Sequence, residues 1–161
     1  HDGALRAATW AHEENIPVAM DIDRVLPNSE ALISKIDFLI ASANFPRDLT
    51  GIDDHCQALR ALRKHCTGFL AVTLGADGVM ALVGEECVRF PAYKVHAIDT
   101  TGAGDIFRGA FIYGLLQEWA LEEIMRFANA AAGLSCTRLG ARAGIPLLAA
   151  ALDLSSKGDR S

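Results

Sequence analysis

Residues 99–107 combine small residues at a helix start with a carboxylate, and these residue types can bind an anion and accept a proton. Gly102, Ala103 and Gly104 stand directly before a run with helical periodicity, and Asp105 falls in the first turn of that run. Small residues let a ligand approach the backbone closely, and the first N–H groups of a helix lack intrahelical partners, so the stretch can bind an anion. A carboxylate beside the anion can accept a proton from an attacking hydroxyl group. For an isolated Gly-x-Gly-Asp, however, a tight turn with an acidic residue at the helix dipole is the better interpretation.

Two better-known phosphate-binding loops are absent from the sequence. The chain contains no GxxxxGK[ST] pattern, and Phe107 occupies the position of the third glycine in GxGxxG. The stretch is therefore neither a P-loop nor a dinucleotide-binding fingerprint. Arg108 follows Asp105 by three residues on the same helical face, where it can contact a phosphate or form an ion pair.

Two other stretches could contribute to a nucleotide site. In residues 72–78, Thr73, Gly75 and Gly78 mark the end of an apolar run and the turn after it, where a hydroxyl and a tight turn could hold a ribose or a phosphate. An ordinary exit from a strand explains these residues equally well. Asn129 lies in an alanine-rich helical run. It could reach a base or bond to a local backbone group, and taken alone the structural explanation is the better one.

An alternation of strands and helices must position these stretches. Short apolar runs predict strands, and the nearly unbroken run at 69–74 predicts the central one. The predicted strands are 18–22, 37–41, 69–74 and a hairpin of 79–83 with 86–90, and residues 91–98 are a candidate edge strand. The predicted helices are 4–14, 30–35, 52–66, 104–118, 121–138 and a short one after Pro146.

This order of elements predicts an α/β fold, a Rossmann-like three-layer αβα arrangement with a mainly parallel sheet plus a β-hairpin. Ligands of such sheets bind beyond the carboxyl ends of the strands, where Ser42 and the turn after Thr73 fall. Residues 42–51 are expected to be a polar segment and residues 140–146 a loop. Residues 1–154 are expected to form a single nucleotide-binding and catalytic domain, followed by a polar tail at 155–161.

Composition narrows the classes of partner. The chain has 161 residues, of which 51% are hydrophobic, so it can build one domain with a substantial core. The net charge of -5 offers no basic surface to a polyanion, so neither nucleic acid nor an acidic membrane is expected as a partner. No secretory leader and no membrane-spanning run is recognisable. The four cysteines lack CxxC spacing and are expected to be reduced in the cytoplasm, and the histidines form no zinc motif.

Taken together, the three stretches resemble one known family. Residues 99–110 resemble the second signature of the ribokinase-like carbohydrate kinases (PfkB family), D-T-T-G-A-G-D-x-F-x-G-A, at every fixed position. Residues 72–78 and 129–131 are similar to ATP-binding stretches of that family and occur in the family's order. The resemblance covers roughly residues 15–150, and the agreement of three ordered stretches outweighs the structural explanations of each one alone.

The resemblance implies a reaction and the residues that perform it. The protein would transfer the γ-phosphoryl group of ATP to a hydroxyl group of a sugar or a related small molecule. Asp105 would be the general base, and Gly102, Ala103 and Gly104 would form the anion hole for the transferring phosphate.

The resemblance also implies the nucleotide and cation sites. Thr73, Gly75 and Gly78 would line the ATP site, and Asn129 would lie near the adenine. Mg²⁺ would arrive with ATP. Relatives hold a monovalent cation such as K⁺ beside the anion-hole loop, and the pair Asp99 and Thr101 matches the start of that site.

Two departures from the family pattern leave alternatives open. The family often has an N-x-x-E element whose Glu helps to organise the magnesium shell, and the matching stretch here is Ser42-Ala43-Asn44-Phe45, in which Asn44 could partly substitute. Family members are also much longer, and their N-terminal half supplies the lid and nearly all sugar contacts. The chain is therefore expected to be the C-terminal, ATP-binding portion of such a kinase, a homodimer being one option for the complete protein. The alternatives are a nucleotide-binding fragment without catalysis of its own and a nucleoside kinase.

Overall fold

The structure is a computed structural model that describes residues 2–157. The chain divides into two compact units, one of His1–Leu74 with Met80–Arg89 and one of Gly75–Val79 with Phe90–Ser161. Each unit is described by itself below. The assignment of residues 1–154 to a single domain stays a prediction.

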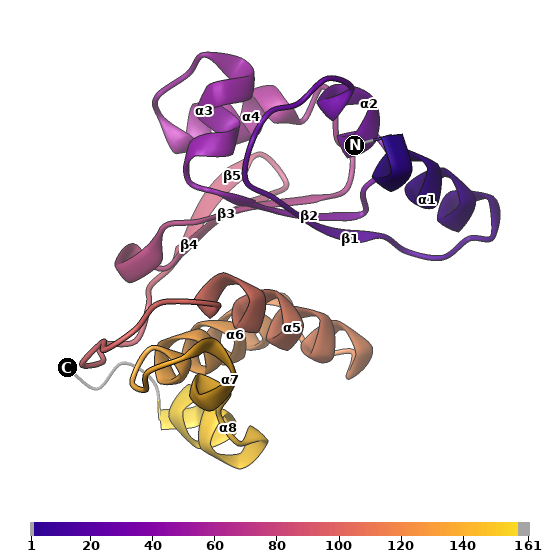
Figure 1. The fold of residues 1–161 in the computed structure, drawn as a ribbon. Helices are drawn as coiled ribbons and strands as arrows, with labels where there is room; N and C mark the ends of the chain where they lie inside the picture. Colours follow the sequence, from indigo (N-terminus) through magenta and orange to yellow (C-terminus); the bar gives the residue numbers. More distant parts are fainter. Residues whose placement is uncertain (1, 158–161) are drawn as a thin grey trace. The chain divides into compact units, whose positions relative to one another are not determined.

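A five-stranded sheet organises the first unit (Figure 1). The strands follow the sheet in chain order: β1 (Ala19–Ile22), β2 (Phe38–Ser42), β3 (Phe69–Thr73), β4 (Val79–Val83) and β5 (Glu86–Phe90). β1, β2 and β3 are parallel, with Asp21 opposite Ile40 and Ile40 opposite Ala71. A connection of two residues joins β4 to β5, which only an antiparallel hairpin allows. The predicted α/β class, the mainly parallel sheet, the hairpin and the central position of β3 are confirmed.

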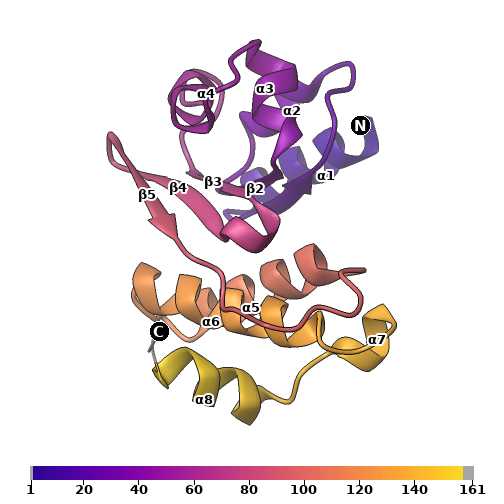
Figure 2. The same ribbon diagram turned by 90° about the vertical axis from the view of Figure 1, so that its left-hand side faces the viewer.

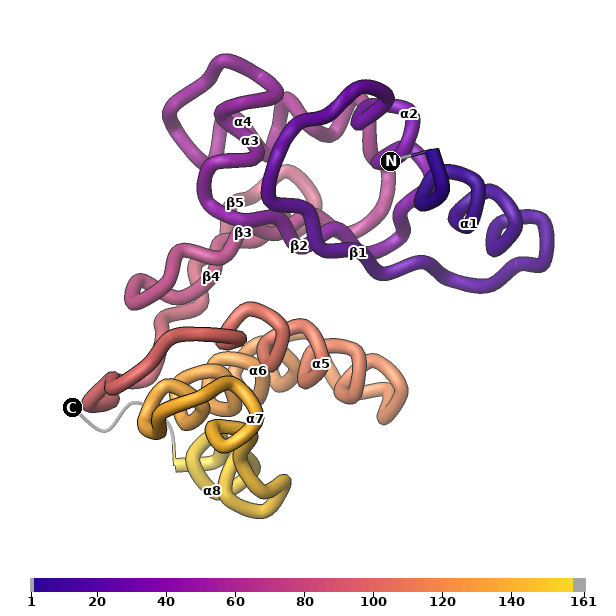
Figure 3. Tube along the Cα trace, in the orientation of Figure 1, coloured from indigo at the N-terminus to yellow at the C-terminus, as the bar shows by residue number. Residues whose placement is uncertain are grey.

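Helices pack on this sheet because each presents one apolar face. They are α1 (Asp2–Glu13), α2 (Ser29–Ile33), α3 (Asn44–Thr50) and α4 (His55–Leu62). α2, α3 and α4 lie over the same face of the sheet (Figures 1 and 2), and the path of the chain between strands and helices is followed most easily in Figure 3. The fully buried side chains include Leu32, Leu39, Phe45, Leu59 and Leu70.

Two boundaries in the first unit differ from the prediction. Residues 42–51, expected to be a polar segment, contain the helix α3, which ends where Gly51 adopts a positive φ of 73°. The helix predicted at 52–66 begins only at His55, because the Asp54 side chain caps it by accepting a hydrogen bond from the Gln57 N–H at 2.8 Å.

The expectation that all four cysteines are reduced is wrong for two of them. Cys56 on α4 and Cys87 on β5 form a disulfide. Cys66, which is buried, and Cys136 remain thiols. The Arg60 guanidinium also ties α4 to the hairpin, because its Nε and Nη2 donate hydrogen bonds to the carbonyl oxygen of Glu85, in the turn between β4 and β5, at 3.3 and 3.0 Å.

Helices dominate the second unit (Figure 2). They are α5 (Ala103–Leu116), α6 (Leu121–Ser135), α7 (Ala141–Gly144) and α8 (Leu148–Lys157), and a 3-10 turn (Gly75–Asp77) belongs to the same unit. α5 packs along α6, and Tyr113, Trp119 and Phe127 form an aromatic cluster with ring centroids 5.2 to 5.8 Å apart.

Three segments of this unit depart from the prediction. Residues 91–98, a candidate strand, run as an irregular segment, and the loop expected at 140–146 contains the short helix α7. Ser155–Ser156 and Lys157, expected in a polar tail, continue α8, and the remaining residues of that tail, 158–161, lie outside the described part of the chain. Between residues 2 and 157 the structure contains no helix with the length and apolarity needed to cross a bilayer.

Candidate active site

The N-terminus of α5 has the geometry of an anion site. Gly102 is the N-cap, and because glycine has no side chain, it cannot cap the first turn itself. The first helical hydrogen bond runs from the Ile106 N–H to the Gly102 carbonyl oxygen at 2.9 Å, so the N–H groups of Ala103, Gly104 and Asp105 have no acceptor within the helix. The Ala103 N–H donates instead to the Thr100 carbonyl oxygen in the preceding loop, at 3.1 Å. Gly102 has a φ of 77°, and a Cβ atom there would lie 3.0 Å from the Cβ of Ala141, so both the turn and the packing require glycine.

Asp105 stands at the mouth of this site. Its side chain is 83% exposed, whereas that of Arg108, one turn later on α5, is only 16% exposed. The Arg108 Nη1 lies 3.6 Å from the Asp105 Oδ1. This distance gives an ion pair without a close hydrogen bond, so the carboxylate is held loosely and is accessible to a ligand.

Asp99 fastens the loop that precedes α5. Its Oδ1 accepts a hydrogen bond from the Thr101 N–H at 2.9 Å, and its Oδ2 accepts one from the Gly140 N–H at 2.8 Å. The Ile98 and Asp99 N–H groups both donate to the Cys136 carbonyl oxygen. Hydrogen bonds from the Thr101 hydroxyl, and then from the N–H groups of Thr101 and Gly140, lower the pKa of Asp99 below its ordinary value. Asp99 and Thr101, the two residues predicted as a cation site, are thus hydrogen-bonded to each other, and Asp99 also connects the loop before α5 to Gly140.

A cavity of about 400 Å³ adjoins the anion site, and all of its walls belong to the second unit. It is large enough for a small organic ligand. Thr100 and Ala103 contribute to its wall and belong also to the loop and first turn of α5, so the cavity and the anion site are continuous. The lining residues are Gly75, Ala76, Ala92, Tyr93, Lys94, Val95, Ala97, Thr100, Ala103, Asn129, Ala132, Gly133 and Cys136.

Asn129 lines this cavity and also supports its wall. Its side chain is buried, at 5% exposure, and its Nδ2 donates hydrogen bonds to the carbonyl oxygens of Phe90 and Pro91, each at 3.1 Å. The amide therefore bonds to backbone, which was one of the two explanations open for it. Because it also borders the cavity, a ligand there would lie beside it.

The residues predicted from 72–78 fall in different places. Gly75 lines the cavity. Gly78, buried with a φ of 86°, packs against backbone, since a Cβ atom there would lie 2.1 Å from the Phe90 carbonyl oxygen. Thr73 belongs to the first unit, where its hydroxyl donates a hydrogen bond to the Ala41 carbonyl oxygen at 3.4 Å.

One wall of the cavity was missed by the sequence reasoning. Tyr93, Lys94 and Val95 come from the irregular segment that was considered as an edge strand. No motif marks these residues. The only available signal was their position directly after the hairpin and before the residues of the anion site.

The described residues offer little to a divalent cation. Within 2–157, no three His, Cys, Asp or Glu side chains gather as a metal-binding group. In the stretch that replaces N-x-x-E, Phe45 is fully buried in the core and Asn44 begins α3.

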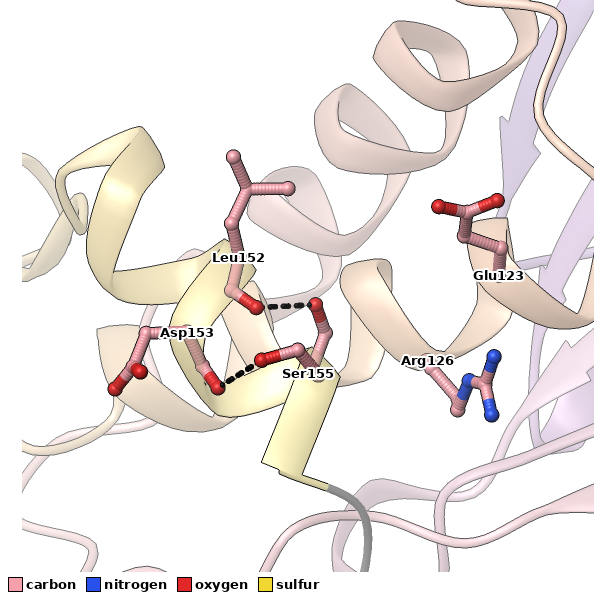
Figure 4. Close-up of a pocket in the computed structure, with 6 residues that line it drawn as sticks. Glu123, Arg126, Leu152, Asp153 and Ser155 are labelled. Atoms are coloured by element: carbon pink, nitrogen blue, oxygen red, sulfur yellow. Dashed lines mark hydrogen bonds between the residues drawn. The ribbon is translucent and has the colours of Figure 1, made fainter.

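A second pocket of about 490 Å³ lies between α6 and α8 and contains none of the predicted site residues (Figure 4). Glu123 and Arg126 come from α6, whereas Leu152, Asp153 and Ser155 come from α8. The Ser155 hydroxyl donates a hydrogen bond to the Leu152 carbonyl oxygen at 2.9 Å. The serine is thus satisfied within its own helix.

The chain belongs to the pfkB family of carbohydrate kinases, which it matches over residues 1–148. It is 41% identical over 148 residues to a ribokinase of Lactococcus lactis, covering 92% of this chain and 48% of that protein. It is 31% identical over 150 residues to the aminoimidazole riboside kinase of Salmonella typhimurium, covering 90% and 44%. The structure of Arabidopsis thaliana ribokinase complexed with ribose and ATP superimposes with a TM-score of 0.85 at 28% identity, covering 94% of this chain and 51% of that one. The chain therefore has the ribokinase fold and spans about half the length of the relatives it matches.

Proposed function

We propose that this chain is the nucleotide-binding and catalytic portion of an ATP-dependent kinase that phosphorylates a hydroxyl group of a sugar or a related small molecule. The observation that carries the proposal is the continuity of the cavity with the uncapped N-terminus of α5, through Thr100 and Ala103. An adenosine moiety in the cavity would direct its phosphates toward that N-terminus, whose N–H groups and dipole favour negative charge.

Asp105 is the general base of this proposal. It accepts the proton of the acceptor hydroxyl, whose oxygen then forms a bond to the γ-phosphorus while the bond to the ADP oxygen breaks. The N–H groups of Gly102, Ala103 and Gly104 stabilise the charge on the transferring phosphoryl oxygens. The 83% exposure of the Asp105 side chain supports the role, because a base must reach a hydroxyl group outside its own helix.

Gly75 and Asn129 bind the nucleotide in this proposal, and both border the cavity. Gly78 contributes by allowing the backbone of the cavity wall to approach closely. The role of Thr73 in the nucleotide site stays a prediction from the family resemblance. Replacement of Asn129 by Ala should weaken ATP binding in calorimetry, and unchanged affinity would remove the residue from the site.

Cations complete the proposal. Mg²⁺ enters as the complex with ATP, and a part for Asn44 in its shell stays a prediction from the family resemblance. Asp99 and Thr101 offer oxygen ligands of the kind that a monovalent cation such as K⁺ prefers, and the lowered pKa of Asp99 keeps its carboxylate charged. A bound cation would stiffen the loop before α5. If replacing K⁺ by choline left activity unchanged, this site would be refuted.

The test of the proposed function is Asp105→Asn in the full-length gene product. Removal of a general base should lower kcat by roughly 10²–10⁴-fold. Asp53→Asn is the matched control, because Asp53 is an exposed aspartate of the other unit. Near-normal turnover of the Asp105 variant would contradict the proposal.

Assays of the purified protein also test two alternatives, a nucleotide-binding fragment without catalysis and a nucleoside kinase. If the 161-residue chain binds ATP with Mg²⁺ but does not turn over, it acts as a nucleotide-binding fragment. A panel of sugars, sugar phosphates, sugar acids and adenosine would distinguish a sugar kinase from a nucleoside kinase. The relationship to both a ribokinase and an aminoimidazole riboside kinase keeps the two acceptor classes in the panel.

A further inference from the structure

Positive charge is distributed unevenly over residues 90–157 of the second unit. This range contains six lysines and arginines, of which three pair with a carboxylate of their own helix: Arg108, Arg126 and Lys157. The other three are exposed and form no ion pair or side-chain hydrogen bond with any described residue: Lys94, Arg138 and Arg142. Because nothing in the described chain neutralises them, these three cations are available to an anionic ligand.

All three unpaired cations lie on segments that border the candidate active site. Lys94 lines the cavity. Arg138 and Arg142 stand two residues before and two residues after Gly140, whose N–H donates a hydrogen bond to Asp99 in the loop before α5. The whole chain has a net charge of -5, so this arrangement places scarce positive charge where the proposed function must hold a phosphate.

The backbone of Arg142 is fixed on both sides. Arg142 lies in α7, a single turn that runs from Ala141 to Gly144. Before this turn, the Gly140 N–H donates to the Asp99 Oδ2 at 2.8 Å. At its end, the buried Gly144 packs on the backbone of Ser135, since a Cβ atom on Gly144 would lie 2.5 Å from the Ser135 carbonyl oxygen. The two contacts set the place of Arg142 relative to the loop before α5.

The turn that carries Arg142 lies beside Asp105. A Cβ atom on Gly102 would be 3.0 Å from the Cβ of Ala141 and 4.0 Å from the Oδ2 of Asp105. Ala141 and the Asp105 carboxylate therefore flank the same point at the N-cap of α5. Arg142 follows Ala141 directly, so its exposed side chain starts from the backbone next to this point.

We infer that Arg142 is a further substrate-binding residue, which pairs with an anionic group of a substrate held next to Asp105; this inference rests on the proposed function. The Asp105 carboxylate, 83% exposed, repels any anion that approaches the site. Arg142 offsets this repulsion, and a guanidinium can donate two parallel hydrogen bonds to a phosphate or a carboxylate. Arg142 has no partner among the described residues, so the pair forms without breaking an existing contact.

Two substrates of the proposed kinase can supply this anionic group. One source is the terminal phosphate of ATP, and the other is an acid group on the acceptor, as in a sugar phosphate or a sugar acid. Both sources present the paired oxygens that a guanidinium matches. The two are distinguished by whether loss of Arg142 weakens the binding of the nucleotide or the use of the acceptor.

The test compares Arg142→Gln, Arg142→Lys and the control Arg126→Gln in the full-length gene product. Calorimetry with Mg²⁺-ATP and with Mg²⁺-ADP measures nucleotide binding, and kcat/KM is measured for neutral and acidic acceptors. If the anion is the terminal phosphate, Arg142→Gln should lose roughly tenfold in affinity for ATP and little for ADP. If it belongs to the acceptor, kcat/KM should fall roughly tenfold for acidic acceptors alone, with nucleotide affinity unchanged. Either result supports the inference.

The controls separate an anion contact from other effects. Arg142→Lys should recover part of the loss because it restores the charge, and the loss should shrink as the salt concentration rises because the pair is exposed to solvent. Arg126 is 51% exposed on α6 and pairs with Glu122, so Arg126→Gln removes the same charge away from the site and should behave as the unaltered protein. The melting temperature of Arg142→Gln should be unchanged, since the side chain packs on nothing in the described chain.

Three results would overturn the inference while the proposed function stands. They are unchanged binding and kcat/KM in Arg142→Gln, an equal loss for ATP and ADP or for neutral and acidic acceptors, and an equal loss in Arg126→Gln. The first would show that Arg142 contacts no substrate, the second that it does not pair with an anion next to Asp105, and the third that only the total charge matters. Failure of the unaltered protein to bind ATP or to phosphorylate any acceptor would instead contradict the proposed function, and the inference with it.

Discussion

Reduction of the disulfide between Cys56 and Cys87 should lower the stability of the first unit, by an amount that depends on the number of residues between the two cysteines. The two cysteines are 31 residues apart. Closing a loop of this length removes conformational entropy from the unfolded chain, which the chain-entropy relation puts at about 3.7 kcal/mol at 25 °C. At roughly 2–4 °C per kcal/mol for a chain of this size, the Tm should fall by about 7–15 °C on reduction.

The assay is thermal unfolding followed by circular dichroism, with and without dithiothreitol. The Cys56→Ser/Cys87→Ser double variant should melt at the temperature of the reduced protein and should not respond to the reductant. The pair of hydrogen bonds from Arg60 to the Glu85 carbonyl oxygen would still join α4 to the hairpin, so the unit should remain folded at 25 °C.

The number of free thiols in the denatured protein tests whether Cys56 and Cys87 form a disulfide. The denatured, unreduced protein should show two thiols, Cys66 and Cys136, and four after reduction. Four thiols before reduction would show that the pair is not oxidised, and the expectation of a fully reduced chain would be restored. In the folded protein Cys66 should react slowly, because burial raises the pKa of its thiol and limits access.

Three further predictions concern the second unit. Gly78→Ala should lower the free energy of unfolding by at least about 2–3 kcal/mol, because Gly78 has a φ of 86° and the new Cβ would lie 2.1 Å from a carbonyl oxygen. Gly75→Ala should lower it by only about 1 kcal/mol, because Gly75 has a φ of 60° and the new Cβ would lie in open space. Urea unfolding of both variants measures the difference. Asn129→Ala should destabilise by about 1–3 kcal/mol in the same assay, because two carbonyl oxygens lose their donor. Since the folded-state pKa of Asp99 lies below its ordinary value of 3.8, the ionised carboxylate stabilises the fold above that pH, and this contribution is lost as the pH falls below 3.8. Asp99→Asn should therefore be less stable than the unaltered protein at pH 7, with a difference that shrinks below pH 3.8.

Local patterns in the sequence predicted those parts of the fold that local physics determines. The apolar runs became β1 to β5 because a strand buried on both faces requires continuous hydrophobicity. Helix α3 was missed because its residues are mostly polar and include Pro46, and it is held by burial of Phe45 in the core. Such a helix depends on tertiary packing, which residue spacing does not reveal.

The disulfide and the cavity wall could not be predicted for a related reason. Cys56 and Cys87 are 31 residues apart in the sequence, and only the tertiary fold brings α4 and β5 within bonding distance. Tyr93 and Val95 reach the cavity because Asn129 and Gly78 hold the preceding residues in place, not because of any pattern of their own. By contrast, the turn at Gly102, the start of α5 and the place of Asp105 in its first turn were predictable, since all three lie within residues 99–107.

Asn129 shows why weighing a binding role against a structural role can be misleading. Its two hydrogen bonds to Phe90 and Pro91 fix the start of the segment that becomes the cavity wall. A buried amide with firm backbone acceptors is costly to move, so it is a rigid point against which a ligand can bind. The same hydrogen bonds that would satisfy a purely structural residue thus preorganise the proposed nucleotide site. A substitution that keeps the shape but removes the donors, Asn129→Leu, should therefore lower nucleotide affinity and stability together, and loss of one without the other would separate the two roles.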